Sequence, residues 1–169
     1  IRDPRDMCIS YKEFNNCDFE HALHAAKGLA RLSKEYKTYD DKYLCTIRYE
    51  DIENSSIETI LKILKFLKIE IDKDKVKEIS NKYSKSNVKK IINKKENEIK
   101  EKLKNKIPID KKEIVNFLGT HRVFDLKTGF QSNHISSRNT GDWKKKLDKS
   151  QIEILNKEFK NWLKEFEYE

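Results

Sequence analysis

The chain begins with IRDPRDMCISY at residues 1–11, and this stretch predicts the end of a strand that runs directly into a helix. Asp3 is a favourable N-cap residue, and Pro4 suits the first helical position because its missing N–H needs no partner there. Asp6 lies in the first turn, where a negative charge meets the positive end of the helix dipole. We expect this helix to extend to about Asn15.

The same stretch places an arginine, Arg2, just before the helix N-terminus and a serine, Ser10, eight residues later. Backbone N–H groups and the helix dipole favour a bound anion at such a position, and an arginine adds charge-assisted donors. The alternative is an ordinary helix cap with a solvated arginine, and the spacing alone favours that alternative.

After this first helix, the sequence alternates between helical and extended patterns. A second helix is expected from Asp18 to near Tyr39, and residues 43–49 have the short, β-rich composition of a buried strand. Capping boxes that begin at Ser55 and Ser150 predict two further helices, the second of which closes the chain.

The composition of the 169 residues excludes several classes of protein. Only 36% of the residues are hydrophobic and 39% are charged, with a mean hydropathy of −0.90, so we expect a small core and a heavily charged surface. No stretch approaches the roughly 18 consecutive apolar residues of a membrane helix, and the first residues lack the apolar core of a signal peptide. The three cysteines form no C-x-x-C pair and support neither a disulfide framework nor a zinc site.

The net charge of +8 is concentrated in residues 73–112, which hold 15 lysines and six acids. A thin apolar stripe there predicts helices that are only partly packed, whereas the composition of residues 117–139 predicts a long loop. The lysines fit either a solvated helical face or a basic helical module that binds the phosphate backbone of nucleic acid. Interleaved acids and a single aromatic residue, Tyr83, favour the solvated face.

Three segments resemble, in order, motifs of the sulfotransferases that use 3′-phosphoadenosine 5′-phosphosulfate (PAPS). Residues 2–11 resemble the family's 3′-phosphate-binding pattern, and residues 47–51 (IRYED) resemble its strand that ends in Tyr-Glu-Asp. Residues 136–144 (SSRNTGDWK) resemble its C-terminal loop, which ends in Gly-x-Trp-Lys. With the final helix, the resemblance spans residues 1–168.

The resemblance implies a cofactor site with two parts. Arg2 and Ser10 would hold the 3′-phosphate of PAPS, and Tyr49 would lie beside the adenine. The C-terminal loop would close over the same phosphate, with its shape set at Gly141. The phosphate ligands of that loop would be Arg138 with Ser136 or Ser137.

The fold implied by the resemblance is α/β, a P-loop nucleotide-kinase-like parallel sheet with flanking helices. Residues 1–169 would form the helix-rich C-terminal part of one sulfotransferase domain, which moves a sulfuryl group from PAPS to a hydroxyl or amine acceptor. The family's Gly-rich phosphosulfate loop and catalytic base precede these motifs, so we expect both outside this chain. No metal is expected, and a cytoplasmic location is expected.

Overall fold

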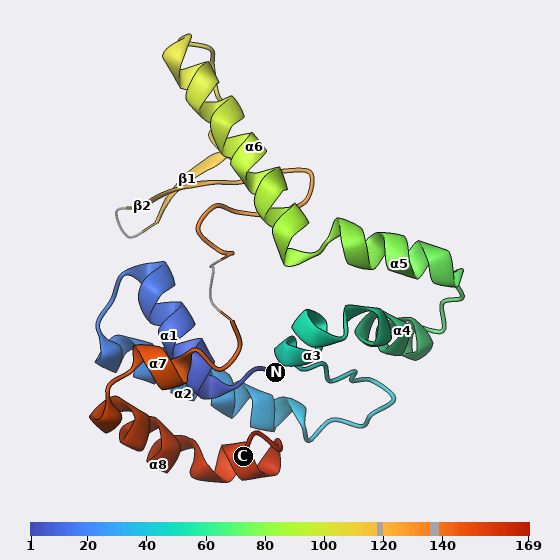
Figure 1. Ribbon diagram of the computed structural model, residues 1–169, viewed down its shortest axis with the longest axis vertical. Coiled ribbons are helices and arrows are strands. Elements are labelled where there is room, and N and C mark those ends of the chain that lie inside the picture. Colours follow the sequence, from blue (N-terminus) through green and yellow to red (C-terminus); the bar gives the residue numbers. More distant parts are fainter. Residues whose placement is uncertain (118–119, 136–138) are drawn as a thin grey trace. The chain divides into compact units, whose positions relative to one another are not determined.

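The computed structural model describes residues 1–117, 120–135 and 139–169, and the chain divides into two compact units. The first unit comprises residues 1–70 and 138–169, and the second unit comprises residues 71–137. Each unit is described separately below, with the element labels of Figure 1.

The first unit is helical throughout its regular structure. Its helices are α1 (Pro4–Asn15), α2 (Phe19–Tyr36), α3 (Tyr49–Asn54), α4 (Ser56–Leu67), α7 (Trp143–Lys146) and α8 (Lys149–Glu165). The core of the unit is built by α1, α2, α7 and α8, which lie together in Figure 1. Its large buried side chains include Leu155, Phe159 and Trp162 on α8.

Side-chain caps confirm the predicted starts of the first two helices. The Asp3 carboxylate accepts a hydrogen bond from the Arg5 N–H, and the Asp18 carboxylate accepts one from the His21 N–H. The last helix begins two residues earlier than the predicted Ser150 cap. Asp148 is its N-cap and forms a reciprocal capping box with Gln151, which satisfies two backbone donors at once.

The predicted α/β fold with a parallel sheet is wrong. The described residues are mostly helical, and their two strands form one antiparallel pair. Residues 44–48 form no strand, and Tyr49 already belongs to α3. The Ile1 amino group donates to the Ile47 carbonyl at 2.6 Å, and the Tyr49 N–H donates to the Ile1 carbonyl at 2.8 Å. A β-rich segment needs a neighbouring strand, and pairing with the single residue Ile1 is too short to make a sheet.

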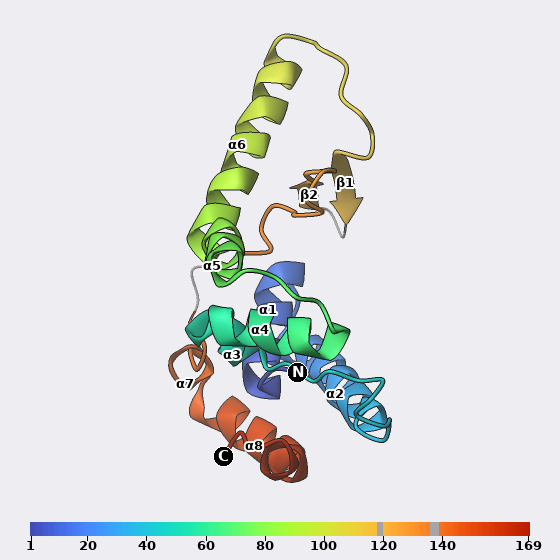
Figure 2. The same ribbon diagram turned by 90° about the vertical axis from the view of Figure 1, so that its right-hand side faces the viewer.

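The second unit packs two helices with a hairpin. Its elements are α5 (Lys73–Lys82), α6 (Lys85–Lys104), β1 (Ile114–Phe117) and β2 (Thr120–Val123). The two helices confirm the helical prediction for most of residues 73–104, whereas residues 105–112 are not helical. The hairpin begins before residue 117 and extends into residues 117–139, which were predicted to be a loop. Figure 2 shows α6 running beside the hairpin, and contacts between α6 and β2 confirm this packing. Neither α6 nor any other described helix is long and apolar enough to cross a membrane.

Candidate functional site

The N-terminus of α1 is capped by the side chain of Asp3. The Asp3 carboxylate accepts the Arg5 N–H at 2.9 Å and also binds the Arg5 guanidinium, with an Nη2–Oδ2 distance of 2.8 Å. The Asp3 carbonyl accepts the Met7 N–H. The backbone donors that a bound anion would use are therefore partly occupied, and an anion site here depends on the neighbouring arginine.

That arginine, Arg2, is held in place by an aromatic ring. Its guanidinium carbon lies 4.3 Å from the centroid of the Tyr49 ring, a cation–π contact that fixes the plane of the guanidinium. The Nε of Arg2 is buried and has no hydrogen-bond partner among the described residues. A buried donor without a partner carries a desolvation cost of about 1–3 kcal/mol, which an anionic ligand would relieve.

The loop that precedes α7 is tied to α1 by a buried carboxylate, Asp6. Its oxygens accept the Gly141 N–H at 2.7 Å and the Trp143 N–H at 3.3 Å. Burial raises the pKa of Asp6, and the two N–H donors oppose that rise by stabilising the ionised form. Gly141 has a φ of +86°, a conformation that favours glycine. The Gly-Asp-Trp segment is thus brought to the Arg-Asp-Pro-Arg-Asp helix.

The same loop is also linked to α3. The Tyr49 hydroxyl donates to Glu53 at 3.1 Å, and the Thr140 hydroxyl donates to the other oxygen of the same carboxylate at 2.8 Å. Tyr49 therefore connects Arg2 on one side with the Thr140–Gly141 loop on the other.

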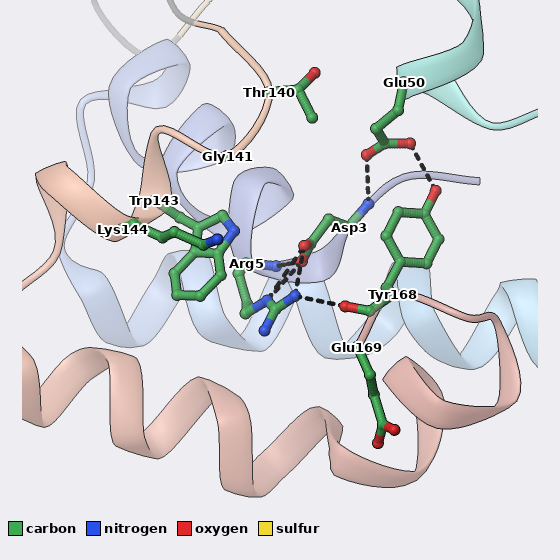
Figure 3. A pocket seen from close by; sticks show the side chains of 9 residues that line it. All are labelled: Asp3, Arg5, Glu50, Thr140, Gly141, Trp143, Lys144, Tyr168 and Glu169. Atoms are coloured by element: carbon green, nitrogen blue, oxygen red, sulfur yellow. Dashed lines mark hydrogen bonds and ion pairs between the residues drawn. The ribbon is translucent and has the colours of Figure 1, made fainter.

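Described residues of the first unit line at least two pockets. The larger encloses about 580 Å³; Arg2 and Tyr49 line it together with mostly apolar side chains of α2 and residues 44–47. The smaller encloses about 370 Å³ and is lined by Asp3, Arg5, Glu50, Thr140, Gly141, Trp143, Lys144, Tyr168 and Glu169 (Figure 3). Of the predicted site residues, Arg2 and Tyr49 line the larger pocket and Gly141 lines the smaller one.

A charged network forms one side of the smaller pocket. Glu50 accepts the Asp3 N–H at 3.0 Å and the Tyr168 hydroxyl at 2.6 Å, as Figure 3 shows. Arg5 donates to the Tyr168 carbonyl at 2.9 Å and lies over the Trp143 ring. Burial, together with the Glu50 carboxylate, raises the pKa of Tyr168 far above its usual value, so this phenol is a hydrogen-bond donor rather than a base.

The predicted site residues have different outcomes. Arg2 lies on the Tyr49 ring, whereas Gly141 lines the other pocket and is linked to Tyr49 through Thr140 and Glu53. Ser10 lies farther along α1, is partly buried and lines neither pocket. Ser136, Ser137 and Arg138 lie outside the described residues.

The sequence prediction missed three residues that organise this region, namely Asp6, Glu50 and Tyr168. Asp6 and Glu50 lie inside quoted motifs, where charge and position in the motif were available as signals. No local signal marks Tyr168, because its partner Glu50 is 118 positions away in the chain.

Comparison with protein-family models, with curated proteins and with solved structures finds no match to this chain. The resemblance to PAPS-dependent sulfotransferases therefore rests on the three sequence motifs alone.

Proposed function

We propose that the first unit binds the 3′-phosphate of PAPS and belongs to a sulfotransferase that acts on a hydroxyl or amine acceptor. The observation that carries the proposal is Arg2, whose buried Nε has no partner among the described residues while its guanidinium lies on Tyr49. An arginine presents its donors in a planar fork, which suits the oxygens of a phosphate.

The charges around Arg2 support this assignment. Asp3 is the acid next to it in sequence, but its charge is paired with Arg5 across 2.8 Å. Asp6 accepts two backbone N–H groups, which offset part of its negative charge. No carboxylate of the described residues forms a direct ion pair with Arg2, although the charge of Arg2 also acts on the buried Asp6 carboxylate. The guanidinium therefore keeps donors for a ligand.

The residues of this chain would bind and position rather than react. Bound PAPS supplies the sulfuryl group, and charge stabilisation at its 5′ end requires a lysine-bearing loop. None of the four glycines here precedes Lys-Ser or Lys-Thr, so the proposal assigns that loop and the catalytic base to sequence outside residues 1–169. Arg2 and the loop anchored by Asp6 would orient the nucleotide's 3′ side.

From this division of roles we expect the 169-residue chain to have no sulfotransferase activity by itself. The measurement is transfer of labelled sulfate from PAPS to a panel of sugars, phenols and amines, with a heat-denatured sample as control. Turnover above that control would contradict the assignment of the reacting groups to other sequence.

Calorimetry with two nucleotides tests the binding proposal directly. We expect 3′,5′-adenosine diphosphate to bind about 10–100-fold more tightly than adenosine 5′-phosphate, because a charge-assisted phosphate contact contributes about 1.5–3 kcal/mol. Arg2→Ala should abolish the difference. Arg31→Ala is the matched control, since that side chain is 78% exposed and pairs with Glu35 on its own helix. Equal affinities for the two nucleotides in the unaltered chain would refute the proposal.

A further inference from the structure

All of the net positive charge belongs to the second unit. Residues 71–137 hold 17 lysines and arginines against nine acids, a net charge of +8, which equals that of the whole chain. The first unit is formally neutral. A small unit with this charge produces a strong local field that attracts polyanions.

Not all of the lysines in the second unit are available to a partner. Lys95 and Lys102 on α6 are partly buried and form ion pairs with Glu113, the Lys95 pair at 2.5 Å. On α5, Lys75 pairs with Glu78 and Lys77 pairs with Asp74, both at 2.8 Å. These four lysines, which include two of the four lysines of α5, have structural or local partners.

The outward face of α6 differs from that of α5. It carries five lysines, which are all exposed and form no ion pair with a described residue: Lys89, Lys90, Lys94, Lys100 and Lys104. The opposite side of α6 holds the buried residues Val88, Ile92 and Ile99. At 1.5 Å per residue, the lysines extend along about 22 Å of one rigid helix. Glu96 and Glu101 are the acids on this side, so positive charge predominates.

We propose that this face of α6 binds the phosphate backbone of double-stranded nucleic acid without regard to sequence. Lysine is a point charge that contacts phosphates but lacks the planar fork with which arginine reads guanine. No aromatic residue lies on this helix, so the stacking platform typical of single-strand binding is missing from it. A band of lysines along one side of a rigid helix can lie against the regular phosphates of a duplex.

The salt dependence of binding gives the first test. The intact 169-residue chain is titrated against a fluorescent 20-base-pair duplex of mixed sequence between 50 and 200 mM salt. Five phosphate contacts predict a slope of log affinity against log salt of about −4.5, which is a loss of about 500-fold across this range. A second duplex of unrelated sequence should bind equally well, and binding that depends on sequence would contradict the proposal.

A pair of charge-matched variants locates the surface. Lys89→Gln with Lys100→Gln removes two charges from the outward face of α6 and should weaken duplex binding about 60-fold at 100 mM salt. Lys75→Gln with Lys77→Gln removes the same charge from α5, where the lysines are already paired, and should change affinity less than about threefold. Equal losses in the two variants would show a diffuse charge effect and overturn the assignment to α6.

A comparison with other polyanions tests whether the partner is a duplex. A single-stranded oligonucleotide and a heparin fragment of equal charge are compared with the duplex at the same salt concentration. The proposal requires the duplex to bind most tightly. Tighter binding of heparin would identify a sulfated polysaccharide as the partner, and tighter binding of the single strand would contradict the duplex; either result overturns the proposal.

Discussion

The two units of this chain use charge in opposite ways. In the first unit, which is formally neutral, Asp6, Arg5 and Glu50 are paired with groups more than 100 positions away in sequence. In the second unit, like charges are displayed side by side along α6. Charges that pair between distant elements build a site with a defined shape. Lysines without ion pairs along a helix produce an electrostatic field but no shaped site. The first arrangement suits a small phosphorylated ligand and the second suits a regular polyanion.

The largest effect is expected from removing a side chain in the core of the first unit. Phe159 on α8 is 3% exposed in the core of the first unit, and Phe159→Ala should destabilise that unit by about 3–5 kcal/mol. Both tryptophans, Trp143 and Trp162, belong to the first unit, so their fluorescence during guanidinium unfolding reports on that unit alone. The helical signal of the second unit should persist at concentrations where the fluorescence transition has moved. A single transition that moves as a whole would contradict the independence of the units.

A smaller effect is expected from the carboxylate that anchors the Gly141 loop. Asp6→Ala leaves one buried and one partly buried N–H group without their acceptor and should destabilise the first unit by about 1.5–3 kcal/mol, as measured by tryptophan fluorescence. Asp41→Ala is the control, because Asp41 is an exposed acid in the same unit and should change stability by less than 0.5 kcal/mol, by the usual range of about ±0.5 for surface positions. An Asp6 variant as stable as the control would mean that the loop is held by other contacts.

The smallest expected effect is a difference in pH dependence between the units. The pKa of Asp6 is raised by burial, so the part of its contribution to stability that depends on protonation is full below the unfolded value of 3.8 and is lost as pH rises through the folded pKa. The pKa of Glu113 is lowered, chiefly by the Lys95 hydrogen bond, so its contribution is full above 4.5 and is lost as pH falls through the folded pKa. The stability of the unaltered chain is compared with the stability of Asp6→Asn and of Glu113→Gln between pH 3 and 7. As pH rises, the difference in stability between the unaltered chain and the variant should change in opposite directions for the two variants. A change in the same direction for both variants would contradict this account.

The sequence predicted what depends on neighbours along the chain and failed where distant partners decide. Asp3, Pro4 and Asp18 specify helix starts within one turn, and the structure confirms them. Residues 43–49 have the composition of a strand, but no strand lies beside them among the described residues. The strand predicted from composition alone was therefore wrong. The hairpin of β1 and β2 was missed because its two four-residue strands are too short for a clear alternating pattern.

The candidate site shows the same division. Arg2, Tyr49 and Gly141 come from three segments, and only the resemblance placed them together in advance. Their contacts now have physical causes, which are the stacking of Arg2 on Tyr49 and the bond from Gly141 to Asp6. No spacing rule could have paired Gly141 with a carboxylate 135 positions away.

The central claim is that Arg2 contacts the 3′-phosphate of a nucleotide, and phosphorus NMR tests it at the level of a single group. When the chain is added to 3′,5′-adenosine diphosphate, the 3′-phosphate resonance should shift more than the 5′-phosphate resonance. The larger shift should disappear with Arg2→Ala and persist with Arg31→Ala. Equal shifts of the two resonances, or a 3′ shift that survives Arg2→Ala, would contradict the claim.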